Sequence, residues 1–286
     1  MSTVLETDLD NQRRHAAFEE GATVGFLTDA SLCIGCKACE VACKEWNGVP
    51  ADGYAFSGLS YDNTVALGAA TWRHVAFCEE NTARGGQRAG SMDGTAQAAF
   101  RWVFLSDVCK HCEVAGCLEA CPTGAIVRTR VGSVYVQDDV CNGCGYCVVS
   151  CPFGVLDRRT FQPGRGGAFK CTLCYDRQKE GMTPACAKTC PTESILFGPL
   201  ETLRRHGLER VETLRRRGFW DAALYHAAAT SVDGVHALFV TLGDPAAYGL
   251  PPRPEVPLIH LAKGWTAAVV TAVVAVAAAF AAFAFL

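Results

Sequence analysis

Residues 141–152, CNGCGYCVVSCP, decide the fold of this chain. Three cysteines fall within seven residues, a fourth follows after three more, and a proline stands directly behind it. On so tight a loop, three thiolates can bind three irons of one [4Fe-4S] cluster, while the chain turns into a helix that carries the fourth cysteine to a neighbouring cluster. A run of this kind therefore needs a partner run, and two paired runs hold two clusters.

The pattern occurs four times. Run 1 covers residues 33–43, run 2 residues 109–121, run 3 residues 141–151 and run 4 residues 171–190. Runs 1 and 3 have the bare C-x2-C-x2-C-x3-C spacing, whereas run 2 has two extra residues before its third cysteine and run 4 has an eleven-residue loop there. Proline follows every run except run 1, where Lys44 takes its place. This is ferredoxin-type spacing, and it predicts four [4Fe-4S] clusters in two modules.

Two other uses of cysteine explain the pattern less well. Structural zinc takes four ligands from two short pairs, which gives no reason for the third cysteine and the C-x3-C ending of each run. Disulfide frameworks belong to short secreted chains, whereas this chain has 286 residues and an odd count of 17 cysteines. Cys78, outside the runs, is interpreted as a small buried hydrophobic residue rather than a ligand.

The segments between the runs indicate how the runs pair. GAIVRTRVGSVYVQ, residues 124–137, predicts a hairpin around Val131-Gly132 that joins runs 2 and 3. Residues 81–98, rich in Gly, Ala and polar residues, predict a surface loop that separates run 1 from run 2. Run 2 therefore pairs with run 3, and run 1 with run 4. Crossing the fourth cysteines within each pair gives set A (Cys33, Cys36, Cys39, Cys190), set B (Cys171, Cys174, Cys186, Cys43), set C (Cys109, Cys112, Cys117, Cys151) and set D (Cys141, Cys144, Cys147, Cys121).

The predicted fold class is α+β, with two ferredoxin-like two-cluster modules, one inserted in the other, and a C-terminal transmembrane helix. Residues 1–98 and 160–198 form the module with sets A and B, and residues 99–159 form the inserted module with sets C and D. Residues 199–257 hold a basic helix, a strand and a proline-rich linker, and residues 258–286 form the anchor.

Three different segments follow run 4: an amphipathic segment, a strand and a long apolar segment. Leucines and Val211 recur at helical intervals over residues 199–219, with arginines on the other face, which predicts an amphipathic helix whose basic face either docks on an acidic surface or is solvated. Residues 236–242, HALFVTL, predict a strand. Residues 265–286 then run for 22 positions without a charge, enough at about 1.5 Å per residue to cross a hydrocarbon core of about 30 Å. Their many alanines favour packing against another membrane subunit.

Charge and composition limit the function. A net charge of −3 gives no sign of a nucleic-acid partner. Residues 1–24 are polar, without the apolar stretch of a signal peptide, so we expect a flexible or wrapping arm, and any export would depend on a partner. Basic residues near the runs could offset the negative charge of the clusters, although ordinary solvated surface charge is the simpler interpretation of each one. These residues are Lys37, Lys44, Lys110, Arg158 and Lys170.

No catalytic residue is predicted. The chain has no glycine-rich phosphate loop after a strand, and no set of histidines and carboxylates that suggests an active site. His111, between Lys110 and Cys112, is interpreted as packing near a cluster rather than as a ligand.

Several segments together carry a family resemblance. The four runs, residues 171–191 (CTLCYDRQKEGMTPACAKTCP), residues 235–257 (VHALFVTLGDPAAYGLPPRPEVP) and the apolar end resemble the iron–sulfur (beta) subunits of membrane-bound formate dehydrogenases. The runs alone are typical of the wider family of four-cluster subunits of molybdopterin oxidoreductases. Nitrate reductase beta subunits have a tryptophan at one ligand position and hold a three-iron cluster there; this chain has Cys144 at the matching place, so four [4Fe-4S] clusters are expected.

The resemblance implies a three-part complex. A molybdopterin-containing catalytic (alpha) subunit with molybdenum or tungsten would oxidise formate, a membrane cytochrome b (gamma) subunit would reduce quinone, and this chain would carry electrons between them. Sets A and B would face the catalytic subunit and sets C and D the haem. The chain would cross the cell membrane once, with its soluble part on the outer face. Alternatives are the same role for a polysulfide, thiosulfate or dimethyl sulfoxide reductase or a hydrogenase, and a non-redox scaffold that binds metal.

Overall fold

The structure is a computed structural model that describes residues 22–53, 56–58, 61–81, 100–228 and 230–284. Most of the N-terminal arm expected over residues 1–24, and of the surface loop expected over residues 81–98, lies outside the described residues.

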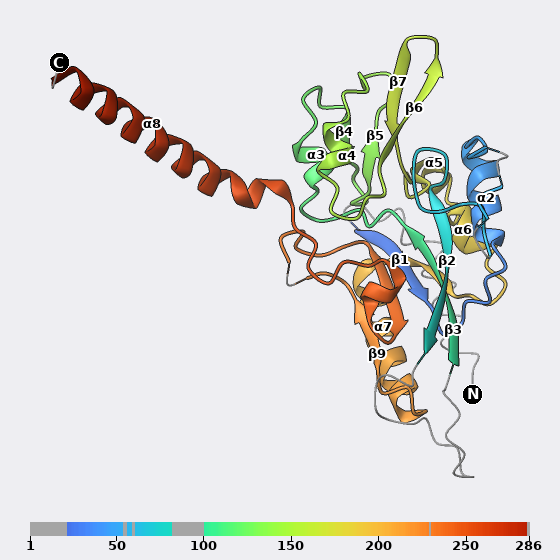
Figure 1. Cartoon of the computed structure of the whole chain (residues 1–286). Helices are drawn as coiled ribbons and strands as arrows, with labels where there is room; N and C mark the ends of the chain where they lie inside the picture. Colours follow the sequence, from blue (N-terminus) through green and yellow to red (C-terminus); the bar gives the residue numbers. More distant parts are fainter. Residues whose placement is uncertain (1–21, 54–55, 59–60, 82–99, 229, 285–286) are drawn as a thin grey trace.

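The centre of the molecule is a four-stranded sheet with the strand order β8-β1-β10-β9 (Figure 1). β1 (Val24–Asp29) pairs in parallel with β10 (Ala237–Leu242) and antiparallel with β8 (Ile195–Pro199), and β9 (Ala222–Tyr225) is antiparallel to β10. Every side chain of β1 and β10 is buried, which agrees with their near-continuous apolar sequences. The sheet thus joins the strand before run 1 to the segment after run 4, and it contains the strand predicted over residues 236–242.

One helix, α7 (Leu200–Arg216), packs on this sheet and confirms the helix predicted over residues 199–219. The predicted apolar positions that are buried are Leu203, Val211 and Leu214. The prediction was wrong for Leu208, which is 51% exposed. Gly207 lies at the inward position instead. A Cβ there would lie 2.8 Å from Leu224 Cδ1 and would crowd the strand beneath, which explains why this position holds a glycine.

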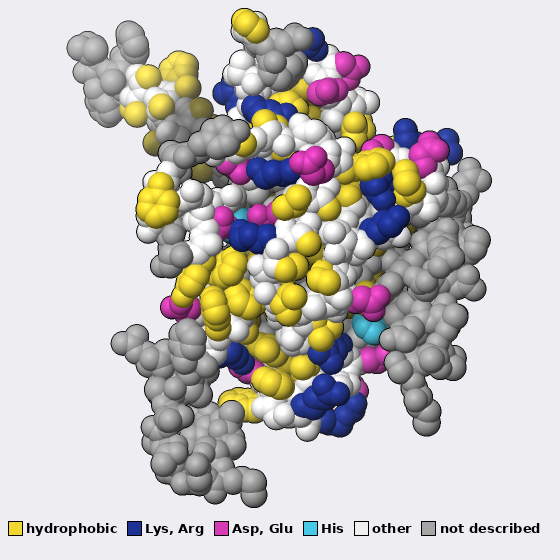
Figure 2. Space-filling view, turned by 90° about the vertical axis from the view of Figure 1, so that its right-hand side faces the viewer, with side chains coloured by type: hydrophobic (Ala, Val, Ile, Leu, Met, Phe, Trp, Pro, Cys, Tyr) yellow, Lys and Arg dark blue, Asp and Glu magenta, His cyan; other side chains and the backbone are white. Residues whose placement is uncertain are grey.

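The arginines of α7 divide between solvent and the sheet. Figure 2 shows Lys and Arg side chains gathered on the lower part of one face, at the height at which α7 lies in Figure 1. The exposed ones on α7 and just after it are Arg204, Arg205, Arg215, Arg216 and Arg217. Arg210 instead pairs with Asp29 at the end of β1 (Nε–Oδ2 2.7 Å) and donates to Ser31 Oγ (2.9 Å), so it fixes the helix to the sheet.

Hairpins and short helices frame the cysteine runs. The hairpins are β2–β3 (Arg73–Asn81 with Phe100–Val108), β4–β5 (Ile126–Arg128 with Val134–Val136) and β6–β7 (Asp157–Gln162 with Arg165–Phe169). The helices are α2 (Ala38–Asn47), α3 (Gly116–Glu119), α4 (Tyr146–Val149), α5 (Tyr175–Lys179) and α6 (Ala185–Lys188). The predicted hairpin between runs 2 and 3 is therefore present as β4–β5. α2 of run 1 packs against α6 of run 4, and α3 of run 2 against α4 of run 3.

The chain ends in a long apolar helix. After the 3-10 helices η3 (Pro245–Tyr248) and η4 (Pro257–His260), α8 (Leu261–Ala284) extends away from the rest of the molecule (Figure 1). In the described part of the chain, one helical stretch, Pro257–Ala281, has the length and the composition, with a mean hydropathy of 2.0, that a membrane crossing requires. The described side chains of that stretch are all exposed.

Candidate metal centres

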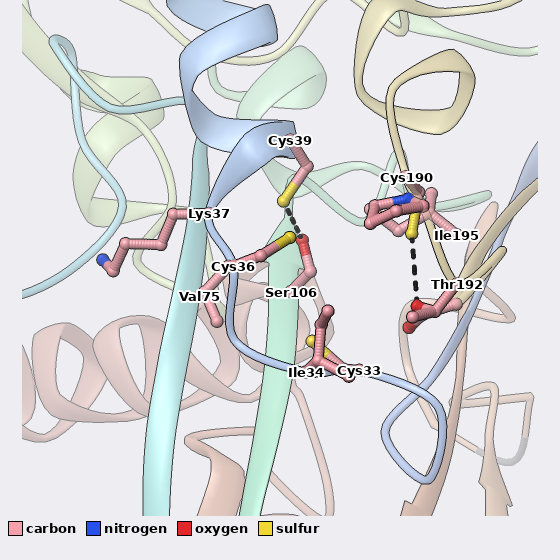
Figure 3. Close-up of a pocket in the computed structure, with 12 residues that line it drawn as sticks. Cys33, Ile34, Cys36, Lys37, Cys39, Val75, Ser106, Cys190, Thr192 and Ile195 are labelled. Carbon is pink, nitrogen blue, oxygen red and sulfur yellow. Dashed lines mark hydrogen bonds between the residues drawn. The ribbon is translucent and has the colours of Figure 1, made fainter.

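The first candidate centre is a cavity of about 300 Å³ that all four cysteines of set A line (Figure 3). Three of them come from the loop before α2 and from its first turn, and Cys190 reaches the cavity from the segment after α6. Two hydroxyls approach the sulfurs: Ser106 Oγ lies 3.2 Å from Cys39 Sγ, and Thr192 Oγ1 lies 3.8 Å from Cys190 Sγ. The structure thus brings together the thiols that crossing runs 1 and 4 predicts.

A second cavity, of about 330 Å³, has the same construction in runs 2 and 3. All four cysteines of set C line it, together with Lys110, His111 and apolar side chains such as Phe153 and Val155. Lys110 is 1% exposed, and its Nζ lies over the rings of Phe153 (5.3 Å) and Phe239 (5.2 Å). Set C is therefore enclosed by apolar groups and one ammonium.

The thiols of set B act on one another through space. Burial raises the pKa of Cys43, and Cys186 and Cys174 raise it further. Burial also raises the pKa of Cys171, with Cys43 the next cause and Cys174 after it. Cys43, from the C-terminal half of α2, thus lies among the three cysteines of run 4.

The four cysteines of set D also lie close together, at the surface of the molecule. Burial raises the pKa of Cys147 to about 11, and the other three members of the set add to the rise. At Cys121 burial favours the neutral thiol, whereas hydrogen bonds from Thr123 and from the Ile126 N–H favour the thiolate. The hydrogen bonds outweigh burial, so the pKa of Cys121 is lowered. Cys144 is exposed, in contrast to the enclosed thiols of set C.

A left-handed residue stands before the second cysteine of every run. The φ angle is +67° at Gly35, +46° at His111, +71° at Gly143 and +60° at Leu173. Glycine adopts this conformation freely and other residues do so rarely, so two of the four positions hold a conformation that the sequence alone does not favour. The turn directs an N–H at the preceding sulfur: Leu173 N–H donates to Cys171 Sγ at 3.3 Å.

The surroundings of these thiols fit metal ligands. Burial is the main cause that raises the pKa of Cys39 to about 11 and the pKa values of Cys117 and Cys174 to about 12. Such thiols are poor free nucleophiles, but a metal ion displaces the proton and makes each one a thiolate ligand. None of the 17 cysteines, all of which the structure describes, forms a disulfide. Four convergent thiols at each place match the number of ligands that a [4Fe-4S] cluster requires.

The four sets follow one another in space in the order A, B, C, D. Where two sets meet, one thiol of the first set has a pKa that is raised mainly by burial, and a thiol of the next set raises the same pKa further. The boundary pairs are Cys39 with Cys186 (A to B), Cys171 with Cys109 (B to C) and Cys117 with Cys147 (C to D).

Comparisons with known proteins indicate that this chain binds iron–sulfur clusters. Two regions, residues 32–125 and 100–200, each match a 4Fe-4S dicluster domain. The chain is 40% identical over 238 residues to the formate dehydrogenase iron-sulfur subunit of Haemophilus influenzae, a match that spans 81% of this chain and 70% of that protein. It is 40% identical over 237 residues to the formate dehydrogenase-O iron-sulfur subunit of Escherichia coli, with 82% and 72% covered. The chain belongs to the family of formate dehydrogenase iron–sulfur subunits.

One component of the anaerobic dimethyl sulfoxide reductase of Escherichia coli is also similar to this iron–sulfur subunit, at 34% identity over 197 residues, with 68% and 83% covered. The subunit is therefore an iron–sulfur electron-transfer subunit of a formate dehydrogenase or of a related molybdopterin oxidoreductase. Two dicluster domains correspond to four [4Fe-4S] clusters, the number that the four runs predicted.

The described part of the iron–sulfur subunit has four buried Lys and Arg side chains, and all of them lie near cysteines. They are Arg73, Lys110, Lys170 and Arg177. Burial favours the neutral amine of Lys170, whereas Cys109 and Cys117 of set C and Cys171 of set B favour the charged ammonium. The cysteines outweigh burial, so the pKa of Lys170 is raised. Lys170 therefore places a charge between sets B and C. Its Nζ donates to the carbonyls of Val134 and Cys171, the latter at 3.1 Å.

Arg73, in β2, has the same position between sets A and B. Burial lowers its pKa, but Cys186 and Cys171 of set B and Cys39 of set A outweigh it, and the pKa is raised. Its Nη1 donates to the carbonyl of Ser106 at 3.0 Å. Sequence reasoning missed Arg73 and Arg177, and its simpler interpretation of Lys110 and Lys170 as solvated was wrong, since they are 1% and 2% exposed.

One cysteine and one group of three side chains lie outside the sets. Cys78 is only partly buried, and its Sγ–H donates to the Ala247 carbonyl at 3.4 Å. Glu40, Asp62 and His74 lie close enough to bind a metal ion, but the Lys37 ammonium pairs with both carboxylates and supplies the positive charge there.

Proposed function

We propose that this subunit conducts electrons through four [4Fe-4S] clusters, from a molybdopterin-containing catalytic subunit that oxidises formate to a membrane cytochrome b subunit that reduces quinone. The observation that carries the proposal is the continuous succession of sets A, B, C and D, each made of four free thiols from two runs. Each set supplies the ligands of one cluster. Formate as the donor is supported by the names of the relatives at 40% identity.

The two modules are nested in this proposal. Residues 99–159 hold sets C and D and are inserted between residues 1–98 and 160–198, which hold sets A and B. The packing of α2 on α6 and of α3 on α4 supports this pairing. The two dicluster matches instead follow the order of the chain, with runs 1 and 2 in one and runs 2 to 4 in the other, so nesting is supported by the contacts rather than by the matches.

When bound, the clusters supply one-electron oxidation and reduction. The cysteines hold them at fixed places, so that neighbouring sets meet at the boundary pairs described above. Apolar side chains such as Val155 and Phe153 exclude water from set C, which strengthens every charge interaction there. Arg73 and Lys170 offset negative charge where two sets meet, and the Ser106 hydroxyl and the Leu173 N–H approach individual sulfurs.

α8 is the membrane anchor in this proposal. It crosses the cell membrane once and packs against the cytochrome b subunit, and the soluble part lies on the outer face, exported together with the catalytic subunit. The exposed apolar side chains of α8, the absence of a charge over residues 265–286 and the proline-rich approach support the anchor. Sets C and D, with the inserted module, would then lie nearer the haem and sets A and B nearer the catalytic subunit.

Anaerobic purification of the complex through this subunit tests the proposal. Iron and acid-labile sulfide counts of at least about sixteen each per complex, with interacting S = 1/2 signals during an EPR titration with dithionite, are expected. Assays with formate and with dimethyl sulfoxide, polysulfide, thiosulfate and hydrogen then identify the partner. Activity with one of the others and none with formate would move the subunit to a related oxidoreductase. Zinc in place of iron and sulfide would refute the electron-transfer role altogether.

A further inference from the structure

The imidazole of His111 has a position that the ligand sets alone do not explain. It is 1% exposed and lines the cavity of set C together with all four cysteines of that set. Its backbone is left-handed, with φ of +46°, a conformation that few non-glycine residues adopt. The loop thus places a buried histidine at the cavity, at a position where runs 1 and 3 have glycine.

A backbone contact fixes which nitrogen carries the proton. The N–H of Val134, in β5, donates to His111 Nδ1 at 3.0 Å. A backbone amide is always a donor, so Nδ1 is the unprotonated acceptor, and the ring carries its proton on Nε2.

The Nε2–H is then a donor without an acceptor. The Nε2 atom is fully buried and has no hydrogen-bond partner among the atoms of the described residues. A buried donor left unsatisfied is rare and costly, so an acceptor is expected at this place. His111 is one of the residues that line the cavity of set C, where sulfur atoms are the acceptors that a cluster would provide.

We propose that His111 Nε2–H donates a hydrogen bond to a sulfur of the cluster held by set C, and thereby raises the reduction potential of that cluster. This inference rests on the proposed assignment of set C. A hydrogen bond to sulfur stabilises the reduced cluster more than the oxidised one, because reduction adds negative charge to the acceptor. His111 is thus a residue that sets the potential of one cluster and not a ligand.

The direct test uses the intact complex with ¹⁵N-histidine incorporated and pulsed EPR of the reduced clusters. A weak ¹⁵N coupling and a proton coupling that disappears in D₂O are expected on one cluster signal. This measurement needs no variant, so it stands even if a substitution at His111 prevents assembly. Four cluster signals without any histidine coupling would overturn the inference and leave the proposed function intact, whereas failure of the proposed function would show as missing clusters.

Variants identify the residue. In His111→Leu, loss of the ¹⁵N coupling is expected, with a roughly three- to tenfold lower ratio of reduced to oxidised cluster at a fixed ambient potential. His111→Gln, whose amide can accept from Val134 and donate to sulfur, should recover much of that ratio. His226→Leu is the matched control, because His226 Nδ1 also accepts a backbone N–H (Ala228, 3.3 Å) but lines neither cavity. A coupling that persists in His111→Leu, or an unchanged ratio with the cluster still present, would overturn the assignment.

Discussion

Replacing Lys170 by Met removes one charge from the boundary between sets B and C and keeps most of the side-chain volume. Lys170 is 2% exposed, and its Nζ donates to the carbonyl of Cys171, itself a member of set B. The thiols that raise its pKa, Cys109, Cys117 and Cys171, belong to both sets, so it is charged in the folded protein. The substitution should therefore lower two reduction potentials and leave the other two nearly unchanged.

The size of the shift follows from Coulomb's law. For two unit charges about 6–8 Å apart in an effective dielectric constant of about 20, the interaction is about 2–3 kcal/mol. For a one-electron couple this corresponds to about 90–120 mV. The potentials of clusters B and C should fall by up to that amount, because the more negative reduced state loses the stabilising charge.

An EPR-monitored redox titration of the purified complex measures the shift, with iron and sulfide counts to confirm that all clusters are present. Lys179→Met, an equal change of charge at an exposed position on α5, is the matched control and should shift potentials far less, because solvent screens it. Lys170→Arg keeps the charge and should stay close to the wild type. Unchanged potentials in a fully loaded Lys170→Met complex would refute the electrostatic reasoning.

Three further outcomes are expected. Cys190→Ser should damage cluster A and leave the signals of clusters C and D intact; loss of all four together would count against two separate modules. Deleting residues 261–286 should release the loaded subunit from membranes without detergent, and a truncated subunit that stays membrane-bound on its own would contradict the role of α8. Burial lowers the pKa of His236, so its imidazole binds a proton more readily in the unfolded chain than in the folded one. The free energy of unfolding should therefore fall as the pH drops below about 6.5, by at most about 1.4 kcal/mol per pH unit. His236→Gln should lose less melting temperature between pH 7.5 and 5.5; an equal loss would assign the acid sensitivity elsewhere.

The cysteine sets could be predicted from sequence because cluster binding is a local chemical demand. A C-x2-C-x2-C loop has few geometries, and the hairpin between runs 2 and 3 fixed which runs are neighbours. The amphipathic period over residues 199–219 and the apolar strand at 236–242 were likewise local signals, and both elements are present in the structure.

The buried cations could not be predicted in this way. Arg73 lies 30 residues after Cys43 and becomes a neighbour of sets A and B only because β2 packs beside α2. Lys110 and Lys170 stand next to cysteines in the sequence, but so do Lys37 and Lys44, which are only partly buried. Gly207, by contrast, could have been predicted at the inward position, because it lies four residues from both Leu203 and Val211, whereas Leu208 lies off that face.

The distribution of these cations divides the four sets into two kinds. Arg73, Lys110, Lys170 and Arg177 all act on thiols of sets A, B or C. Near set D, Cys144 is exposed and Tyr146 and Val149 are 60% and 80% exposed, so water stabilises charge there in place of fixed cations. A partner that covers this face would remove that water and lower the potential of cluster D, because desolvation disfavours the more negative reduced state. The potential of cluster D, and not those of clusters B and C, should therefore rise when the membrane partner is removed from the complex, and equal shifts in a redox titration would contradict this division.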